Sequence, residues 1–372
     1  MAEDSLPLVG DIPAMTFQLP QKFKGIAGGQ GKGGFLQIVS IIYSLQGKLC
    51  RGTLQNQTII QFLKSVDVMV TDSMYICSFM LSQIANKRNI MIGISGTLLS
   101  PVPYPAYPSH PAYIPQIGTT FNSKMNFFQR VKNTIAACIK ELILFNAMNY
   151  LAYTIKHEYN IRPDLGYYEL MQSQEVTLVA GDFAVDYARP VPANMMLIGP
   201  LSSLPASPLP EELEKFMQSS GDDGVILVSM GTIFEFAESA IPTLLSGFKK
   251  VKQKILWKTR LNVENAPDNV KVVRWMPQND VLGHAKLKAF VTHGGSKGIY
   301  EAAYHGVPLI GMPTQAEQEL NIAKAKAAGV ATSLDKDNLT PDVITEAITE
   351  MIKNPRYVKI DETVNINYNK YV

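Results

Sequence analysis

The stretch from Thr292 to Glu301, THGGSKGIYE, brings glycines, a histidine, a hydroxyl and an acid into close succession. The glycines let the backbone approach a ligand closely, and Ser296 is a favoured N-cap for the helix that should follow. The free N–H groups and positive end of that helix suit a phosphate, to which His293 adds a hydrogen bond or a positive charge. Glu301, on the same helix, can accept hydrogen bonds from ribose hydroxyls. Taken alone, the stretch fits a Gly-rich turn with a capped helix and an exposed glutamate equally well.

Trp275 stands beside Pro277 and Gln278, at the end of an expected strand. An indole in this place can stack on a base while the Gln278 amide bonds the edge of that base. A tryptophan buried in the core is the more common fate of such a residue. Because the His293 stretch lies one strand away, we favour the stacking role for Trp275.

A sheet is needed to gather these residues, and the sequence alternates strand-like and helix-like runs from residue 66 onward. Continuous apolar strands joined by crossover helices indicate parallel sheets covered on both faces, and therefore an α/β fold. The run from Phe121 to Tyr159 has the apolar spacing of helix. In the first 65 residues only Ile38–Leu45 suggests a helix. We expect strands at Val66–Asp72, Asn89–Ser95, Val176–Ala180, Met195–Gly199, Gly224–Met230, Lys254–Lys258, Val270–Trp275, Lys288–His293, Pro308–Met312 and Ala331–Leu334.

The length of 372 residues predicts two domains, at about 100–200 residues per domain. The run Pro200–Pro210, PLSSLPASPLP, is rich in Pro and Ser and indicates an extended linker. We expect a Rossmann-like domain at 1–200 that lacks its opening strands, a linker at 201–210, a complete Rossmann-like domain at 211–355 and a C-terminal tail at 356–372. A hydrophobic content of 46% excludes dominant disorder, and a net charge of +2 argues against nucleic-acid binding through a basic surface.

Polar and aromatic residues concentrate at the ends of four strands in the second domain. Ligands bind outside the carboxyl ends of the strands in open parallel sheets, so this concentration predicts a cleft at that edge. The residues are Gly231 and Thr232, then Trp275 and Gln278, then His293 and Ser296, then Thr314, Glu317 and Gln318.

Other signals favour structural interpretations. The three cysteines, Cys50, Cys77 and Cys138, show no CxxC spacing, so we expect neither a disulfide framework nor a zinc site. Glu301 and His305 lie one turn apart, but no third ligand is evident, and we predict no metal. The run Gly29–Gly34 satisfies GxGxxG but follows no convincing strand, which indicates a loop.

From the sequence as given, we expect no membrane signal at either end. Met1 begins an acidic segment, whereas a secretory signal begins with basic and then apolar residues. No stretch reaches the roughly 20 apolar residues that span a bilayer. The closest, Glu141–Ile155, contains two Asn and is interpreted as a buried helix.

Longer motifs extend the pattern around Trp275 and His293. The run WMPQNDVLGH (Trp275–His284), followed by the run from Phe290 to Gly329, resembles the signature of the UDP-glycosyltransferases, in particular the animal UDP-glucuronosyltransferases. The resemblance extends to GDFAVDYARPVPANMMLIGPL (Gly181–Leu201) and GVILVSMGT (Gly224–Thr232). It implies a GT-B fold of two Rossmann-like domains, with a UDP-sugar on the C-terminal domain and a small lipophilic acceptor on the N-terminal one. The UDP-sugar is a co-substrate, and no cofactor is implied.

Position by position, the resemblance implies that Trp275 stacks on uracil beside Gln278 and that Glu301 holds the ribose. The pair Glu317-Gln318 falls where the family has an Asp-Gln pair that holds the sugar hydroxyls. Because Glu317 is one methylene longer than Asp, the sugar preference is open to change. The residues expected around the diphosphate are Thr232, His293, Ser296 and Gly298.

The resemblance also implies inverting transfer without a metal. A histidine removes the acceptor proton, the acceptor oxygen attacks the anomeric carbon and UDP leaves. Asp72 matches the aspartate that orients this histidine. The family's histidine lies near the mature N-terminus, and this sequence has none in its first hundred residues. His110 and His157 are the candidates to replace it, although such histidines are usually structural or solvated.

Three functions therefore stay open. The first is an active transferase of a hexosyl group, glucuronosyl or glucosyl. The second is an inactive UDP-sugar-binding isoform or a truncated fragment, because the family's signal peptide and C-terminal membrane anchor are also absent. The third, which the fold alone permits, is a dinucleotide-dependent oxidoreductase. The family's setting is the endoplasmic reticulum membrane, with membrane association and pairing with family members as the expected contacts.

Overall fold

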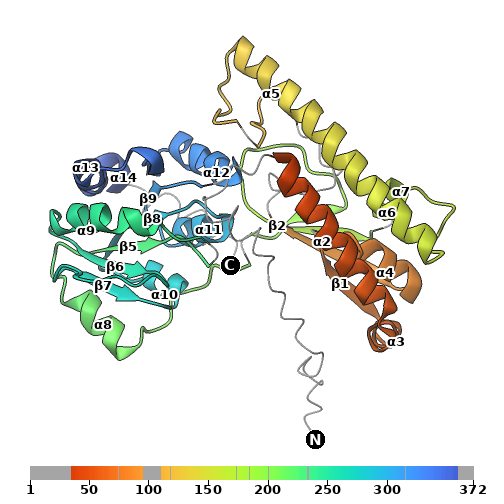
Figure 1. Cartoon of the computed structure of the whole chain (residues 1–372), viewed down its shortest axis with the longest axis horizontal. Coiled ribbons are helices and arrows are strands. Elements are labelled where there is room, and N and C mark those ends of the chain that lie inside the picture. Colours follow the sequence, from red (N-terminus) through yellow and green to blue (C-terminus); the bar gives the residue numbers. More distant parts are fainter. Residues whose placement is uncertain are drawn as a thin grey trace, which may run out of the picture.

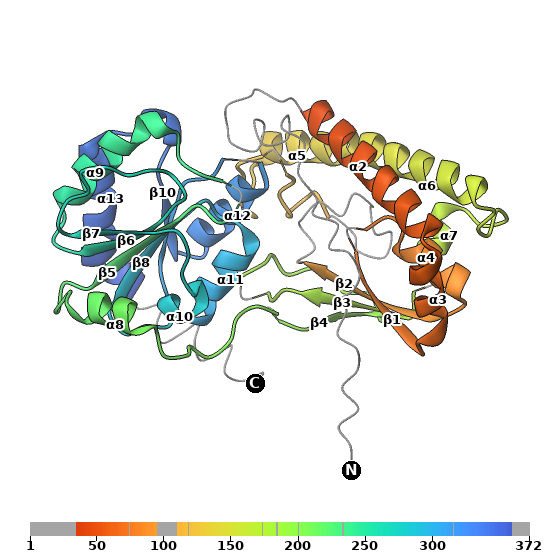
Figure 2. The ribbon, with the colours of Figure 1, turned by 60° about the horizontal axis from the view of Figure 1, so that its bottom comes forward.

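Two α/β domains lie next to each other, each built on one parallel sheet (Figures 1 and 2). The computed structural model describes residues 35–358, except 74, 95–109, 118, 173, 184, 200, 233 and 315. The expected loop at Gly29–Gly34 lies outside the described residues. Every expected strand is present: β3 and β6 have the expected bounds, and the other strands differ by one or two residues at one or both ends.

The N-terminal sheet has four parallel strands in the order β1-β2-β3-β4. Their carboxyl ends therefore meet at one edge, where Asp72 pairs in register with Ile92. The strands are β1 (Val68–Asp72), β2 (Arg88–Ile94), β3 (Val176–Ala180) and β4 (Met195–Leu197).

Helices cover one face of this sheet, and their apolar side chains form its core with Met69 of β1 and Met91 of β2. Asn56 ends the first of these helices and begins the second, because its side chain accepts hydrogen bonds from the N–H groups of Thr58 and Ile59. The covering helices are α2 (Phe35–Gln55), α3 (Gln57–Ser65), α4 (Ser78–Ala85), α6 (Asn146–Glu158) and α7 (Tyr167–Gln172).

A continuous helical run joins α5 (Phe127–Lys140), the π-helical segment η1 (Glu141–Phe145) and α6. It begins at a capping box between Asn126 and Gln129. Within the described residues, Phe127–Glu158 is the single run that is long and apolar enough to cross a membrane, by length and composition alone. This finding corrects the expectation that no stretch qualifies.

The expected burial of Glu141–Ile155 holds for one face of that helix only. Leu151 and Ile155 are buried, whereas Leu142 and Tyr150 are largely exposed. Sequence spacing identified the helix correctly, but it does not show which apolar side chains the rest of the protein covers.

The C-terminal sheet has six parallel strands in the order β10-β9-β8-β5-β6-β7. After β5 the chain builds β6 and β7 on one side, and it then crosses to build β8, β9 and β10 on the other. The direction of winding therefore changes between β5 and β8. The strands are β5 (Val225–Ser229), β6 (Lys254–Lys258), β7 (Val270–Val273), β8 (Leu287–Thr292), β9 (Leu309–Gly311) and β10 (Ala331–Ser333).

Both faces of the C-terminal sheet are covered, as the continuous apolar strands predict. All five residues of β5 are buried, and alternate side chains enter opposite cores. Ile226 and Val228 face the core lined by α9 (Ile241–Lys249) and α13 (Pro341–Lys353). The other face packs against α8 (Glu211–Gln218), α10 (Gln278–Leu282), α11 (Ser296–Tyr304) and α12 (Ala316–Ala327).

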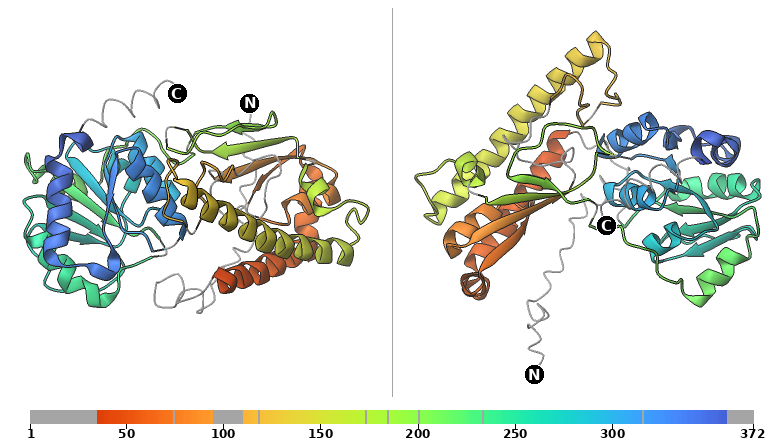
Figure 3. Two further views of the ribbon diagram at one scale, coloured as in Figure 1. Left: turned by 90° about the horizontal axis from the view of Figure 1, so that it is seen from above. Right: turned by 180° about the vertical axis from the view of Figure 1, so that it is seen from behind.

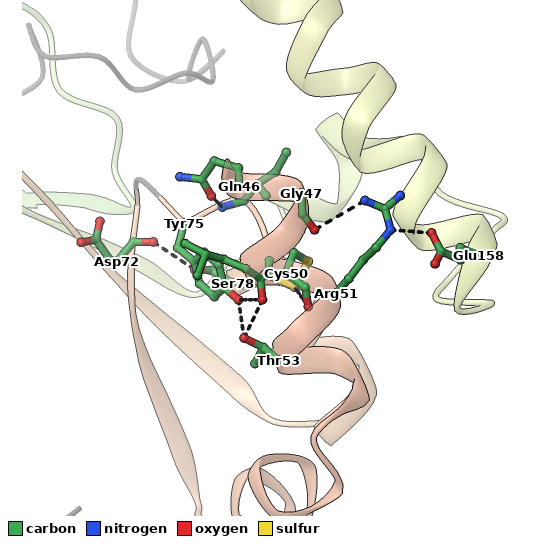
Figure 4. The surroundings of a disulfide bond; sticks show 12 residues. Gln46, Gly47, Cys50, Arg51, Thr53, Asp72, Tyr75, Ser78 and Glu158 are labelled. Atoms are coloured by element: carbon green, nitrogen blue, oxygen red, sulfur yellow. Dashed lines mark hydrogen bonds and ion pairs between the residues drawn. A yellow bond between two sulfur atoms is a disulfide. The ribbon is translucent and has the colours of Figure 1, made fainter. Parts of the chain in front are cut away.

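A disulfide joins Cys50 of α2 to Cys77 at the start of α4 (Figure 4). Both residues are fully buried, and their Cα atoms lie 5.2 Å apart. The expectation that the cysteines form no disulfide is therefore wrong. The two cysteines are 27 residues apart in the sequence and meet only because α2 packs over the sheet beside α4. Arg51 of α2 also bonds Glu158 of α6, 2.8 Å away (Figure 4).

We predict that replacing both Cys50 and Cys77 with alanine lowers the free energy of unfolding by about 2–4 kcal/mol, because the unfolded chain loses a constraint. Urea unfolding under non-reducing conditions measures the change. Cys138 is exposed and unpaired, so Cys138→Ala is the matched control and should leave the unfolding curve unchanged. Equal stability of the double variant and the control would contradict a formed disulfide.

Candidate functional site

The point where the C-terminal sheet changes its winding direction brings Gly231 and His293 into contact. Gly231 follows β5 and His293 follows β8, and these strands are neighbours in the sheet. A Cβ built on Gly231 would lie 2.7 Å from Cε1 of His293, and the Gly231 φ of +81° is also one that glycine favours. Ligands bind at such points in open parallel sheets, which is why the strand-end residues predicted a cleft at this edge.

His293 lies between two glycines and is largely shielded from solvent. A Cβ on Gly295 would come within 2.6 Å of Nε2, and the ring of Phe234 has its centroid 5.5 Å away. Nδ1 is buried without a hydrogen-bond partner among the described residues. Burial, and secondly the positive charge of Lys258, lower the pKa of His293 to about 4. The ring is therefore neutral near pH 7.

The N-terminus of α11 begins one residue earlier than expected. Gly295 is the N-cap, with φ −66° and ψ 140°, and Ser296 is already the first helical residue. The prediction of Ser296 as N-cap is therefore wrong. The Ser296 hydroxyl does not cap the helix but lies 3.4 Å from Oε1 of Glu317, to which it donates a hydrogen bond. Because glycine has no side chain to cap the helix, the first N–H groups of α11 are left for an anion.

Gln278, Gly298 and Glu301 meet where α10 lies against α11. The Gln278 amide donates a 2.7 Å hydrogen bond to Oε2 of Glu301. A Cβ on Gly298 would lie 3.6 Å from that amide nitrogen. Glu301 is only 2% exposed, and burial raises the pKa of its carboxyl. The hydrogen bond from Gln278 and the nearby Lys297 lower this pKa, but their effect is smaller than that of burial.

Trp275 is 73% exposed, so the alternative of a core tryptophan is wrong for this residue. The other tryptophan, Trp257 of β6, takes the core position and is fully buried between Phe236 and Phe248. Trp275 precedes Gln278 by three residues, and its indole face is free to stack on an aromatic ligand.

The first turn of α12 contributes Glu317 and Gln318 differently. Glu317 is connected to α11 through Asn321, which lies one turn further along α12. Nδ2 of Asn321 lies 3.1 Å from Oε1 of Glu317 and 3.2 Å from Oγ of Ser296 on α11. Burial raises the pKa of the Glu317 carboxyl. Gln318 is buried, and its Oε1 accepts bonds from the N–H and hydroxyl of Thr314.

Two predicted residues lie at the margins of this cluster. Thr232 follows Gly231 and is exposed at the same edge. Asp72 is exposed at the carboxyl end of β1 in the other domain, and its backbone oxygen accepts a 2.9 Å bond from Ser78 (Figure 4). Of the candidate bases, His157 bonds the carbonyl of Tyr153, and His110 stacks on Tyr113.

Sequence reasoning missed Lys258 and Asn321. Lys258 ends β6, and its ammonium donates a hydrogen bond to the carbonyl of Gly231, which places a cation beside His293. The signal was available, because Lys258 is the last residue of an expected strand whose end faces the same edge. The side chain of Asn321 on α12 donates a hydrogen bond to the carbonyl of Gly294, just before α11. The sequence carries no signal for this bond, because it depends on how the two helices pack together.

A carboxylate from the N-terminal domain links the two helices of the cluster. Asp186 follows β3, and it accepts a 2.7 Å bond from the Tyr300 hydroxyl of α11 and an ion pair from Lys324 of α12. All three side chains are buried. The helices that carry Ser296, Glu301 and Glu317 are therefore tied to the other domain.

Comparisons with known proteins bear on this cluster. The family described as "UDP-glucoronosyl and UDP-glucosyl transferase" matches residues 26–363. Human 2-hydroxyacylsphingosine 1-beta-galactosyltransferase is 31% identical over 317 residues, covering 83% of this chain and 58% of that protein. UDP-glucuronosyltransferase 2B33 of Macaca mulatta is 32% identical over 345 residues, covering 87% and 62%. The chain thus spans about three fifths of the length of these relatives.

Solved structures share the fold. The calicheamicin glycosyltransferase CalG4 superposes with a TM-score of 0.61 at 16% identity, over 97% of this chain and 79% of that one. Phytolacca americana UGT2, complexed with UDP-2fluoro-glucose and pterostilbene, gives a TM-score of 0.56 at 18% identity, over 90% and 75%. These likenesses confirm the GT-B fold predicted from the sequence.

We predict that stability falls as the pH falls from 6.5 to about 4, in part because of His293. In this window unfolded chains bind a proton at His293 that the native protein excludes, so stability rises with pH. The contribution reaches at most about 3 kcal/mol. Urea unfolding across this range should show a flatter pH dependence for His293→Gln than for wild type. The exposed His157→Gln control should keep the wild-type slope, and identical slopes for all three proteins would refute the shifted pKa.

We also predict that Asp186→Asn lowers the free energy of unfolding by about 3–5 kcal/mol, because it removes the carboxylate that forms the buried ion pair with Lys324. Thermal and urea unfolding measure this loss. The matched control is Asp337→Asn, which removes the partner of Lys336 in an exposed pair and should cost about 1 kcal/mol or less. A loss at Asp186 no larger than at Asp337 would contradict the buried link between the domains.

Proposed function

Because this chain belongs to the UDP-glycosyltransferase family, we propose that it binds a UDP-sugar at the carboxyl edge of its C-terminal sheet and transfers the sugar, with inversion, to a small lipophilic acceptor. The observation that carries the proposal is the convergence of Gln278, Glu301, His293 and the open N-terminus of α11 at one sheet edge. The sugar is a hexose, glucuronosyl or glucosyl by resemblance, and the relatives include a galactosyltransferase.

In this proposal the nucleoside part of the UDP-sugar is bound by Trp275, Gln278 and Glu301. The exposed indole stacks on uracil. The buried Glu301 carboxylate, already bonded by Gln278, accepts from the ribose hydroxyls. A buried carboxylate is costly unless it is hydrogen-bonded, and the ribose hydroxyls would supply bonds that water cannot reach to make.

The diphosphate is bound by the N–H groups at the start of α11 and by His293, with Ser296, Gly298 and Thr232 around it. As UDP leaves, negative charge grows on its phosphate oxygens. Fixed N–H dipoles already aimed at that charge stabilise it without reorganising. Lys258, next to His293, adds a positive charge that a neutral imidazole does not. Glu317 and Gln318 would hold the sugar hydroxyls, and Asp72 would orient a base on the acceptor side.

The cellular setting proposed from the resemblance is the lumen of the endoplasmic reticulum, at its membrane. The Cys50–Cys77 bond supports this setting, because disulfides persist in the oxidising secretory compartments and are rare in the cytosol.

Binding of UDP tests the donor site. We expect Trp275→Ala and Glu301→Ala each to weaken UDP affinity about tenfold or more in calorimetric titrations, through lost stacking and a lost charge-assisted bond. Trp275 is exposed, so its replacement should leave the fold intact even if Glu301→Ala destabilises the protein. Glu346→Ala, on the remote helix α13, is the matched control. Unchanged affinity in both site variants would show that the donor site is wrongly assigned.

Product formation then separates an enzyme from a binding protein. Purified chain is incubated with a phenol and with UDP-glucuronate, UDP-glucose or UDP-galactose, and glycoside is detected by mass spectrometry. We expect a product that Glu301→Ala reduces. UDP binding without any glycoside would favour the inactive isoform.

A further inference from the structure

The linker at residues 201–210 is bonded to the C-terminal domain along its length. All ten of these residues are described, and they contain no helix or strand. The chain crosses here from the N-terminal domain to α8 (Figure 1 and the right view of Figure 3). Most of its side chains are exposed, but its backbone makes hydrogen bonds to α10, the helix that begins at Gln278.

Asn279 bonds both backbone groups of one linker residue, Leu204. Its Oδ1 accepts a 3.2 Å hydrogen bond from the Leu204 N–H, and its Nδ2 donates a 3.0 Å hydrogen bond to the Leu204 carbonyl. The two bonds fix the orientation of the Asn279 amide, because a flipped amide would place nitrogen at the N–H and oxygen at the carbonyl. The next residue, Asp280, accepts a 3.0 Å bond from the Ser207 N–H. Two consecutive residues of α10 therefore hold the linker at two points.

His305, at the end of α11, supports the same amide from the other side. Its Nε2 lies 3.1 Å from Oδ1 of Asn279. Burial lowers the pKa of His305, so the ring is neutral near pH 7 and carries one hydrogen. Because an amide oxygen can only accept, that hydrogen is on Nε2. The Asn279 side chain is thus held between the linker and α11, the helix that also carries Glu301.

The linker also packs against α10 so closely that Gly283 has no room for a side chain. A Cβ built there would lie 2.5 Å from Cβ of Ala206 in the linker and 2.8 Å from Cε1 of His305. Leu209 packs against the apolar core beneath α10. Contact and hydrogen bonds together therefore join the linker to this helix.

The bonded part of α10 adjoins the residue that is proposed to bind the base. Gln278 directly precedes Asn279, and its amide nitrogen donates a 2.7 Å bond to Glu301. Helix α10 has five residues, and so short a helix is only weakly held by its own hydrogen bonds. Contacts from outside the helix must therefore fix the direction of the Gln278 amide.

The direction of this amide decides which base it can bond. Because the Gln278 nitrogen donates to Glu301, the Gln278 oxygen is the atom that can accept a hydrogen from the base. Uracil carries a hydrogen on its N3 atom, whereas the N3 atom of cytosine has none. A fixed Gln278 oxygen therefore favours uracil, which a freely turning amide does not.

We propose that Asn279 is a positioning residue for uracil recognition. By bonding the Leu204 backbone to α10, it holds Gln278 in the orientation that selects uracil over cytosine. The linker thereby acts as part of the nucleotide site and not as a free connection. This inference rests on the proposed UDP site.

Hydrogen exchange of backbone amides tests the attachment itself, without any ligand. We expect the Leu204 amide to be protected in wild type and to exchange about tenfold faster in Asn279→Ala. Asn354→Ala is the matched control, because the Asn354 side chain also accepts from a backbone N–H, that of Arg356, at the far end of α13. It should leave the exchange at Leu204 unchanged.

Calorimetric titration with UDP and CDP tests the consequence for the base. We expect Asn279→Ala to weaken UDP binding about tenfold through one lost hydrogen bond and to change CDP binding little. A merely structural role would weaken both nucleotides alike and keep their ratio. Gly283→Ala, which displaces the linker without changing the Asn279 amide, should reduce the same ratio, whereas Asn354→Ala should keep it. Melting temperatures close to that of wild type confirm that each variant is folded.

The results that would overturn the inference differ from those that would overturn the UDP site. A Leu204 amide that exchanges freely in wild type removes the attachment. A UDP-to-CDP ratio that Asn279→Ala and Gly283→Ala leave unchanged, while Trp275→Ala weakens UDP binding, refutes the positioning role and retains the site. UDP affinity that neither Trp275→Ala nor Glu301→Ala alters refutes both.

Discussion

The close approach of β5 and β8, which leaves room for no side chain at Gly231, is the constraint on which the proposed donor site depends. The imidazole of His293 fills the place that a Cβ on Gly231 or on Gly295 would take. This packing holds the ring beside the N-terminus of α11 and away from most solvent, so the pKa of His293 falls and the ring stays neutral. A neutral imidazole N–H next to the N–H groups at the start of α11 can donate to a phosphate without adding a buried positive charge.

The rest of the C-terminal domain serves to keep that arrangement fixed. Asn321 and Glu317 hold the first turns of α11 and α12 together, and Gln278 holds Glu301. Asp186 extends the same connection to the N-terminal domain through Tyr300 and Lys324. A buried carboxylate from the N-terminal domain is thereby coupled to the two helices that carry the proposed donor contacts.

Apolar periodicity predicted the sheets well, and it placed β3 and β6 residue for residue, because buried strands leave a local signal. The stacking role of Trp275 was favoured because the His293 stretch lies one strand away, and the structure shows Trp275 exposed. Long-range contacts had no such signal. The Cys50–Cys77 bond depends on how α2 packs beside α4, and the role of Ser296 depends on Glu317 from another helix. The exposure of Leu142 and Tyr150 depends on what covers a helix, which an apolar pattern cannot show.

The position of the nucleotide is the central claim, and a crystal structure of the chain grown with UDP tests it most directly. The account predicts uracil density stacked on the indole of Trp275, ribose oxygens within bonding distance of Glu301, and diphosphate density at the N–H groups of Gly295 to Gly298 beside His293. UDP density elsewhere, or an indole of Trp275 that does not contact it, would contradict the account.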